Sequence, residues 1–298
     1  MRIFVTGASG WVGSSVVDEL LAAGHDVTGL ARSDASAAAL DRRGVAVHRG
    51  DLDDPGSLRA AAEAADAVVH LAFKHDFTDY AGAGRTERAV VEAFGDALAG
   101  TGKTFMLASG LAGAGLGRPL TERDPSPHVG PDALRGGSEA LALSFVDRGI
   151  RPVALRFAPT VHGEGDHGFV AQLVRVARET GVAAYVGDGT SRWAAVHRLD
   201  NARMVRLALD KAAAGSAVHG VAEEGVPSRA IAEAIGRGLG LPVVSVAPED
   251  ALAHFGWIGG FFSLDVTASS DVTRETLGWD PTHPTLLEDL DAGYYFRA

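Results

Sequence analysis

Hydrophobic and polar positions alternate in a regular order along the first half of the chain. Short apolar runs of strand length are separated by longer stretches in which apolar residues recur at helical spacing. The predicted strands are Ile3–Val5, Val27–Ala31, Ala67–Leu71, Lys103–Ala108 and Arg151–Phe157, and the predicted helices are Val12–Ala23, Ser57–Ala64, Arg85–Ala99 and Ala133–Arg148. Because this order produces parallel strands covered by helices, the pattern predicts an α/β fold with a doubly wound parallel sheet.

The order becomes less regular after residue 157. The region 158–192 is rich in Gly, His and Asp, and two further helices are predicted at Asp200–Ala214 and Ser228–Gly240. We therefore expect a large domain from residues 1–162 and about 193–222. The remaining residues, about 163–192 and 223–298, are expected to form a smaller C-terminal lobe that binds the substrate.

A glycine-rich segment, T-G-A-S-G-W-V-G, follows the first predicted strand. Gly7 suits a tight turn, Gly10 lets the backbone approach a pyrophosphate, and Gly13 lets the helix pack closely on the strand. The free N–H groups of the helix N-terminus attract phosphate. The segment predicts a Rossmann-type dinucleotide-binding domain, with a ligand-free turn as the alternative, and its predicted cofactor contacts are Gly7, Ser9, Gly10, Trp11, Val12 and Gly13.

The end of the second predicted strand bears on the choice of cofactor. An NAD site usually has an acidic residue there for the ribose 2′-hydroxyl, whereas this chain has Ala31 followed by Arg32 and Ser33. A guanidinium matches phosphate oxygens, so NADP(H) is preferred over NAD(H). The alternative is that Arg32 is a solvated loop cation, and the carboxylate of Asp34 would oppose a 2′-phosphate.

Composition narrows the possible partners. The 298 residues are 46% apolar, with 27 basic and 38 acidic side chains and a net charge of −11. Without a run of basic residues, we expect a small-molecule substrate and neither nucleic acid nor membrane as a partner. The absence of cysteine excludes disulfides and thiolate chemistry. The N-terminal residues resemble a strand, and no apolar run reaches membrane-spanning length, so we expect a cytoplasmic protein.

Several motifs in order resemble the short-chain dehydrogenase/reductase superfamily, in its extended, NAD(P)-dependent epimerase/dehydratase-like branch. Besides the glycine motif, they are Asp51-Leu52, His70-Leu71-Ala72, the strand ending at Ser109, R-x-x-x-x-x-G from Arg156, G-D-G with V-H-x-x-D (187–200), and L-G-W-x-P (277–281). The resemblance covers most of the chain. It implies an enzyme, and a possible homodimer through helices 85–99 and 133–148.

The same resemblance implies further cofactor contacts. Asp51 and Leu52 are expected near the adenine, and His70-Leu71-Ala72 beside the middle of the cofactor. The full set is Asp51, Leu52, Leu71, Ala72, Phe73, Lys74, Ser109, Pro159, Thr160, Val161 and His162.

The chain departs from the family at the catalytic Y-x-x-x-K motif, whose register falls on R-G-G-S-E, residues 135 to 139. Arg135 cannot donate the proton, because a guanidinium stays protonated, but it can stabilise an oxyanion. Glu139 inverts the charge of the lysine. The alternative interpretation is a solvent-facing Arg–Glu pair one helical turn apart.

Other groups must then supply a proton. Ser109 remains at the strand end, Lys74 and His75 follow the predicted strand Ala67–Leu71, and His162 begins a loop with further acid–base groups. Together with Arg135, these four are the predicted catalytic residues. The spacing of His162 and His167 is not an established metal motif, so no metal is predicted.

We therefore predict an NADP(H)-dependent oxidoreductase that acts on a carbonyl, enone or imine with a proton donor other than tyrosine. One alternative is an NADP-binding sensor or scaffold without catalysis. Another is a non-redox isomerase or cyclase in which the cofactor is structural.

Overall fold

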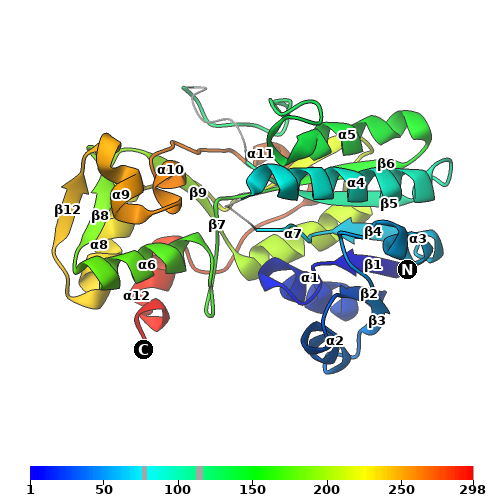
Figure 1. Ribbon diagram of the computed structural model, residues 1–298, viewed down its shortest axis with the longest axis horizontal. Coiled ribbons are helices and arrows are strands. Elements are labelled where there is room, and N and C mark those ends of the chain that lie inside the picture. The colour runs from blue at the N-terminus through cyan, green and yellow to red at the C-terminus, as the bar shows by residue number, and fades with distance from the viewer. Residues whose placement is uncertain (76–78, 112–116, 298) are drawn as a thin grey trace.

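The computed structural model describes residues 1–75, 79–111 and 117–297, and it contains a seven-stranded parallel sheet (Figure 1). Its strand order is β10-β6-β5-β4-β1-β2-β3, and each neighbouring pair is parallel. The strands are β1 (Arg2–Thr6), β2 (Asp26–Ala31), β3 (Ala46–Arg49), β4 (Ala67–His70), β5 (Thr104–Gly110), β6 (Arg151–Phe157) and β10 (Ser216–Gly220).

Helices cover both faces of this sheet (Figure 1). One face carries α1 (Trp11–Ala22), α2 (Asp34–Asp41), α7 (Arg198–Lys211) and α11 (Asp271–Leu277). The other carries α3 (Gly56–Ala64), α4 (Tyr80–Leu98), α5 (Ser138–Ser144) and the 3₁₀ turns η1 (Leu134–Gly137) and η2 (Phe145–Arg148). All four residues of β4 are buried, which explains why the central strands are continuous apolar runs. The predicted doubly wound α/β fold is confirmed.

A second hydrophobic core forms a smaller lobe. Its elements are α6 (Phe169–Thr180), β8 (Ala183–Val186), α8 (Ser228–Leu239), β12 (Val243–Val246), η3 (Pro248–Asp250), α9 (Ala251–Phe255), α10 (Ile258–Phe262), α12 (Leu286–Asp291) and η4 (Tyr294–Phe296). A three-stranded sheet, ordered β11 (Glu223–Pro227), β9 (Arg192–His197) and β7 (Thr160–His162), lies between the lobe and the large domain (Figure 1).

The chain returns to the large domain near its C-terminal end. Ala268, Leu277 and Trp279 are buried in the core of the large domain, and the indole N–H of Trp279 donates to the carbonyl of Asp200 at 3.0 Å. The expected division assigned all of 223–298 to the small lobe. The packing instead groups α11 and Trp279 with α7 of the large domain.

The single helix expected at Ala133–Arg148 is wrong, because the chain there forms η1, α5 and η2. Arg135 has φ 53° and ψ 30°, and Gly136 and Gly137 are also left-handed. A Cβ on Gly136 would lie 2.6 Å from the carbonyl oxygen of Gly84 on α4. The paired glycines therefore allow close backbone contact with α4, at the cost of a regular helix.

Within the described residues, no helix is both long and apolar enough to cross a membrane.

Candidate functional site

The glycine-rich loop between β1 and α1 is closely packed. Gly7 has φ 68°, and a Cβ on Gly13 would lie only 2.0 Å from the carbonyl oxygen of Gly7. A Cβ on Gly7 would lie 2.8 Å from the backbone nitrogen of Ala72, which follows β4. Gly10 precedes α1 without a side-chain cap, so the first amides of the helix are not occupied by a capping side chain. These features fit a dinucleotide pyrophosphate at the carboxyl edge of the sheet.

A buried hydrogen-bond chain holds this loop against β4. The hydroxyl of Thr6 lies 2.6 Å from Nδ1 of His70 and accepts the N–H of Ala72 at 3.2 Å. His70 is fully buried, and burial lowers its pKa to about 3. The histidine of the H-x-A motif is thus neutral and positions the loop.

The cationic residue that follows β2 lies at the surface. Arg32 is exposed, and the hydroxyl of Ser33 caps α2 by accepting the N–H of Ser36 at 3.2 Å. Asp34 forms an ion pair with Arg49 at the end of β3, so its charge is compensated.

The acidic loop after β3 lies along the same edge. The Oδ1 atom of Asp51 accepts the N–H of Asp53 at 3.0 Å, and Leu52 packs against the core. Lys74 forms an ion pair with Asp53, which places its ammonium on the side expected for the adenine.

Arg135, at the position where the resemblance places a tyrosine, is held by α4. Its Nε donates to Oε2 of Glu87 at 2.9 Å, and its Nη2 contacts Oε1 of the same carboxylate. Nη2 also donates to the carbonyl of Ala108 at 3.0 Å, next to Ser109. Glu87 is only 2% exposed; burial raises its pKa, while the charge and hydrogen bond of Arg135 oppose that shift. The result is a fixed cation beside the end of β5.

Glu139, at the position of the lysine, forms a separate buried pair. It accepts hydrogen bonds from Nε of Arg156 at 3.0 Å and from Nη2 at 2.7 Å. Both side chains are at most 6% exposed, and Arg156 Nη1 lies 3.4 Å from Nε2 of His219. The solvent-facing Arg135–Glu139 pair is therefore wrong, because each charge has its own buried partner from another element.

Two further catalytic candidates lie near Arg135. Ser109 is half-buried at the end of β5, opposite Arg156 in the sheet register. The ring of His75 packs edge-on against Phe73 with centroids 5.3 Å apart. Burial lowers the pKa of His75, and the charge of Arg135 lowers it further. Their catalytic roles stay predictions.

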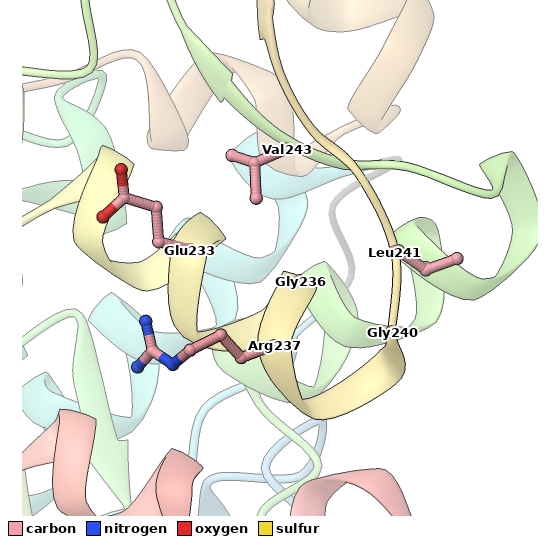
Figure 2. A pocket seen from close by; sticks show the side chains of 6 residues that line it. All are labelled: Glu233, Gly236, Arg237, Gly240, Leu241 and Val243. Atoms are coloured by element: carbon pink, nitrogen blue, oxygen red, sulfur yellow. The ribbon is translucent and has the colours of Figure 1, made fainter.

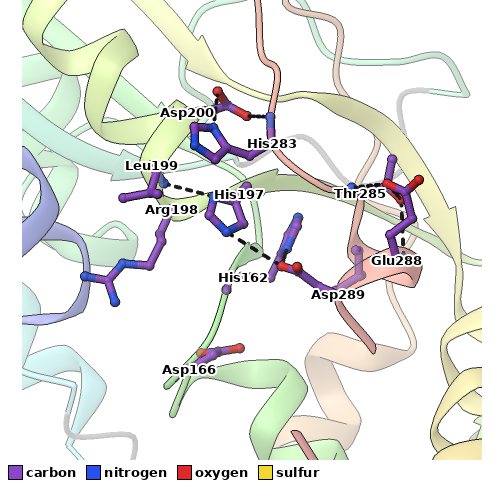
Figure 3. Close-up of polar contacts among 12 residues, drawn as sticks. His162, Asp166, His197, Arg198, Leu199, Asp200, His283, Thr285, Glu288 and Asp289 are labelled. Atoms are coloured by element: carbon purple, nitrogen blue, oxygen red, sulfur yellow. Dashed lines mark hydrogen bonds and ion pairs between the residues drawn. The ribbon is translucent and has the colours of Figure 1, made fainter. Parts of the chain in front are cut away.

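His162 lies at the junction of the lobes (Figure 3). It is fully buried, and its Nδ1 lies 2.5 Å from Oδ2 of Asp289 on α12. Its ring also packs edge-on against His197, which stacks on His283 at 4.8 Å. Its assigned roles stay predictions, and it is the least accessible of the five catalytic candidates.

The neighbours of His162 join the lobes to the phosphate loop. The indole of Trp11 donates to the carbonyl of Val161 at 2.6 Å, and the guanidinium of Arg198 lies 4.0 Å from the centre of the same indole. Thr160 donates to the carbonyl of Ala194 at 2.7 Å, and Pro159 is half-buried just before β7. Across the described ranges, no three or more His, Asp or Glu side chains are arranged to hold a metal ion.

A surface hollow in the small lobe lies outside this region (Figure 2). It is lined by residues of α8, of the loop that follows and of the start of β12, among them Glu233, Arg237 and Leu241. None of its lining residues was predicted to bind the cofactor or the substrate.

Glu87 was missed at the sequence level, although a signal was present. It occupies the apolar stripe of the predicted helix, together with Val90, Val91 and Phe94. A carboxylate at a buried stripe position requires a buried partner. Tyr80, which begins α4, carries no such signal, because the residue four positions after it is Gly84 and not a lysine.

Comparison with known proteins agrees with this geometry. Residues 3–221 match the model of the NAD dependent epimerase/dehydratase family. An uncharacterized protein of Schizosaccharomyces pombe is 45% identical over 99% of this chain and 100% of its own length. A 3-diazoavenalumate denitrifying reductase of Streptomyces is 27% identical over 97% of this chain and 99% of that protein.

Among solved structures, a dTDP-glucose 4,6-dehydratase from Streptomyces venezuelae has a TM-score of 0.78 with 23% identity, covering 99% of this chain and 96% of that one. A UDP-glucose 4-epimerase from Thermotoga maritima has a TM-score of 0.77 with 21% identity, covering 99% and 98%. These two likenesses concern the fold. The family model, which matches more than half of the chain, shows that the chain belongs to the NAD dependent epimerase/dehydratase family.

Proposed function

We propose that the protein is an NADP(H)-dependent oxidoreductase that reduces a small-molecule carbonyl, enone or imine without the Y-x-x-x-K tyrosine. The observation that carries this proposal is the fixed cation of Arg135 beside Ser109, at the carboxyl edge of the sheet that also carries the phosphate loop. Ligands of doubly wound sheets bind along this edge.

The preference for NADP(H) rests on the charges after β2. Arg32 is exposed and available to a 2′-phosphate, and the ion pair with Arg49 compensates Asp34, the carboxylate that would repel one. Ser33 is already used as a helix cap. Arg32 is therefore the main discriminating residue in this proposal.

The chemistry follows from what these residues can do. A bound reduced nicotinamide supplies hydride. Arg135 cannot release a proton, but its charge stabilises the negative charge that develops on the acceptor heteroatom. Because Glu87 fixes the guanidinium from behind, this stabilisation requires no reorganisation of the side chain.

Relatives of similar length support a reductase. Besides the diazoavenalumate reductase, a 2-alkyl-3-oxoalkanoate reductase of Stenotrophomonas maltophilia is 28% identical over 83% of this chain and 78% of that protein. The names of these two relatives describe reductions of different acceptor groups. We therefore assign the reaction type and leave the acceptor as a class.

Binding and turnover of the purified full-length chain test the proposal. We expect NADPH to bind more tightly than NADH by calorimetry, and its absorbance to fall in the presence of an α-ketoester, an enone or a cyclic imine. Arg32→Ser should weaken NADPH binding by about 10- to 100-fold, with little effect on NADH. The matched control is Arg42→Ser, which removes an exposed arginine at the end of α2.

Two outcomes would support other functions. Tight NADPH binding without turnover of any acceptor would favour the sensor or scaffold. Conversion of a substrate without a change in nicotinamide absorbance would favour a non-redox isomerase or cyclase. Equal effects of Arg32→Ser and Arg42→Ser would contradict the assigned role of Arg32.

A further inference from the structure

Three polar side chains contact the ring of Phe73, which follows β4. The guanidinium of Arg135 lies 4.4 Å from the centre of this ring. The rings of His75 and Tyr80 pack against it with centroid distances of 5.3 Å and 5.7 Å. An acid–base group, a phenol and a fixed cation therefore contact one aromatic ring, and the cation also donates to the carbonyl of Ala108, next to Ser109.

The direction of α4 explains why Tyr80 reaches this place. Residues four and seven positions apart lie on the same helical face, so Tyr80, Gly84 and Glu87 form one stripe. Gly84 packs against the backbone of Gly136, and Glu87 binds Arg135. The stripe therefore faces η1, and Tyr80 lies at its N-terminal end, on the side of Phe73.

We propose that Tyr80, supplied by α4, is the proton donor that replaces the tyrosine missing from residues 135–139. It takes the place of the non-tyrosine donor expected from the sequence. This inference rests on the proposed reductase function. Arg135 then replaces the missing lysine as the cation that stabilises the phenolate.

The charges around Tyr80 suit this role. Burial raises the pKa of its phenol, the positive charge of Arg135 lowers it, and the carboxylate of Glu87 raises it. The half-buried phenol is thus protonated in the resting protein. It releases its proton when an acceptor atom becomes negative, and Arg135 stabilises the phenolate that remains.

The reaction balances without another reagent. The reduced nicotinamide named in the proposed function would supply the hydride and be oxidised. The acceptor carbon gains this hydride and forms a C–H bond, while the electron pair of the C=O or C=N bond moves to the heteroatom. The O–H bond of Tyr80 breaks as that heteroatom is protonated. The phenolate then regains a proton from solvent, so the protein returns to its starting state.

Kinetics of Tyr80→Phe form the first test. This change keeps the ring that packs on Phe73 and removes only the hydroxyl. We expect kcat to fall by about 100- to 10,000-fold with an α-ketoester, while the affinity for NADPH stays within about twofold. The control is Tyr185→Phe, which alters a tyrosine on β8 of the small lobe that stacks with Arg229.

Ionisation of Tyr80 forms a second test that needs no substrate. Tyrosine labelled with ¹³C at Cζ would be followed by NMR from about pH 8 to about pH 12, with the Tyr80 signal identified by its loss in Tyr80→Phe. The oxidised nicotinamide is positively charged and the reduced one is neutral. We therefore expect the pKa of Tyr80 to be lower with NADP⁺ than with NADPH, by about one unit.

The outcomes separate the two proposals. If the unaltered protein reduces no acceptor, the proposed function fails, and the NMR comparison still decides whether Tyr80 faces the nicotinamide. If the unaltered protein is active and Tyr80→Phe keeps its kcat, Tyr80 is not the donor. An identical pKa of Tyr80 in both cofactor complexes would also overturn the inference.

Discussion

Arg135 and Glu87 form an ion pair in which one partner is almost completely buried. Removing one partner of such a pair leaves the other charge without compensation in a low-dielectric environment. In the proposed function, the same pair determines where a cation lies beside the substrate. A single pair therefore affects both stability and the site.

Replacement of Arg135 should show directly how much the pair contributes to stability. We expect Arg135→Met to lower the free energy of unfolding by about 3–5 kcal/mol, because Glu87 would be buried without a partner. The double variant Arg135→Met/Glu87→Gln should recover part of that loss, since a neutral amide costs less to bury. Urea denaturation measures both values.

An exposed pair provides the control. Arg175 and Glu179 on α6 are more than half exposed and lie one helical turn apart. Arg175→Ala should change the free energy of unfolding by less than about 1 kcal/mol. If Arg135→Met cost no more than this, the burial of Glu87 would be refuted.

At the scale of elements, β1 and β4 are joined through side chains as well as through their backbone ladder. Thr6 at the end of β1 pairs with His70 at the end of β4, both in the sheet register and through the hydroxyl–imidazole contact of 2.6 Å. This junction also positions Ala72 under the phosphate loop. The loop therefore depends on a histidine that must stay neutral.

The stability of this junction should depend on pH. Burial, the main cause, and the charge of Arg135 lower the pKa of His70 from 6.5 to about 3. Between these values the unfolded chain binds a proton at His70, whereas the folded chain does not. The contribution of neutral His70 to the free energy of unfolding is therefore fully present above pH 6.5 and is lost as the pH falls from 6.5 towards 3. We expect His70→Gln to reduce the slope of unfolding free energy against pH by roughly 1 kcal/mol per unit in this window.

Denaturation series from acidic to neutral pH measure the slope. The partly exposed His25, at the start of β2, offers a comparison through His25→Gln. If His70→Gln and His25→Gln both showed the same slope of unfolding free energy against pH as the unaltered protein, the assigned role of His70 would be contradicted.

At the scale of the whole molecule, α12 connects the two lobes. Its Asp289 contacts His162 on β7 (Figure 3). The N–H of Leu286 donates to Glu223 on β11 at 2.8 Å. Leu286 and Leu290 are fully buried in the core of the small lobe. The last helix thus fixes the small lobe against the strands that lead from the large domain.

Loss of the Asp289 carboxylate should weaken the connection between the two lobes. Asp289→Ala should cost about 2–4 kcal/mol of unfolding free energy, because buried His162 loses the acceptor of its charge-assisted hydrogen bond. Cleavage by a protease in the small lobe should also become faster. Asp291→Ala, which removes an exposed carboxylate two residues later, should change both values little. Equal effects of the two substitutions would exclude a connecting role for Asp289.

The sequence by itself determined the parallel sheet and the glycine-rich loop after β1. These features follow from local causes: the period of apolar residues and the glycines of a tight turn. The helix expected through Gly136 and Gly137 failed because close packing on Gly84 outweighed the regular period.

Only the tertiary structure decided which charges meet. Arg135 is 48 residues from its partner Glu87, Glu139 is 17 from Arg156, and His162 is 127 from Asp289. No period or spacing encodes such pairs, because each is set by the packing of separate elements. Tyr80 likewise became a candidate only when the fold placed α4 beside Phe73 and Arg135.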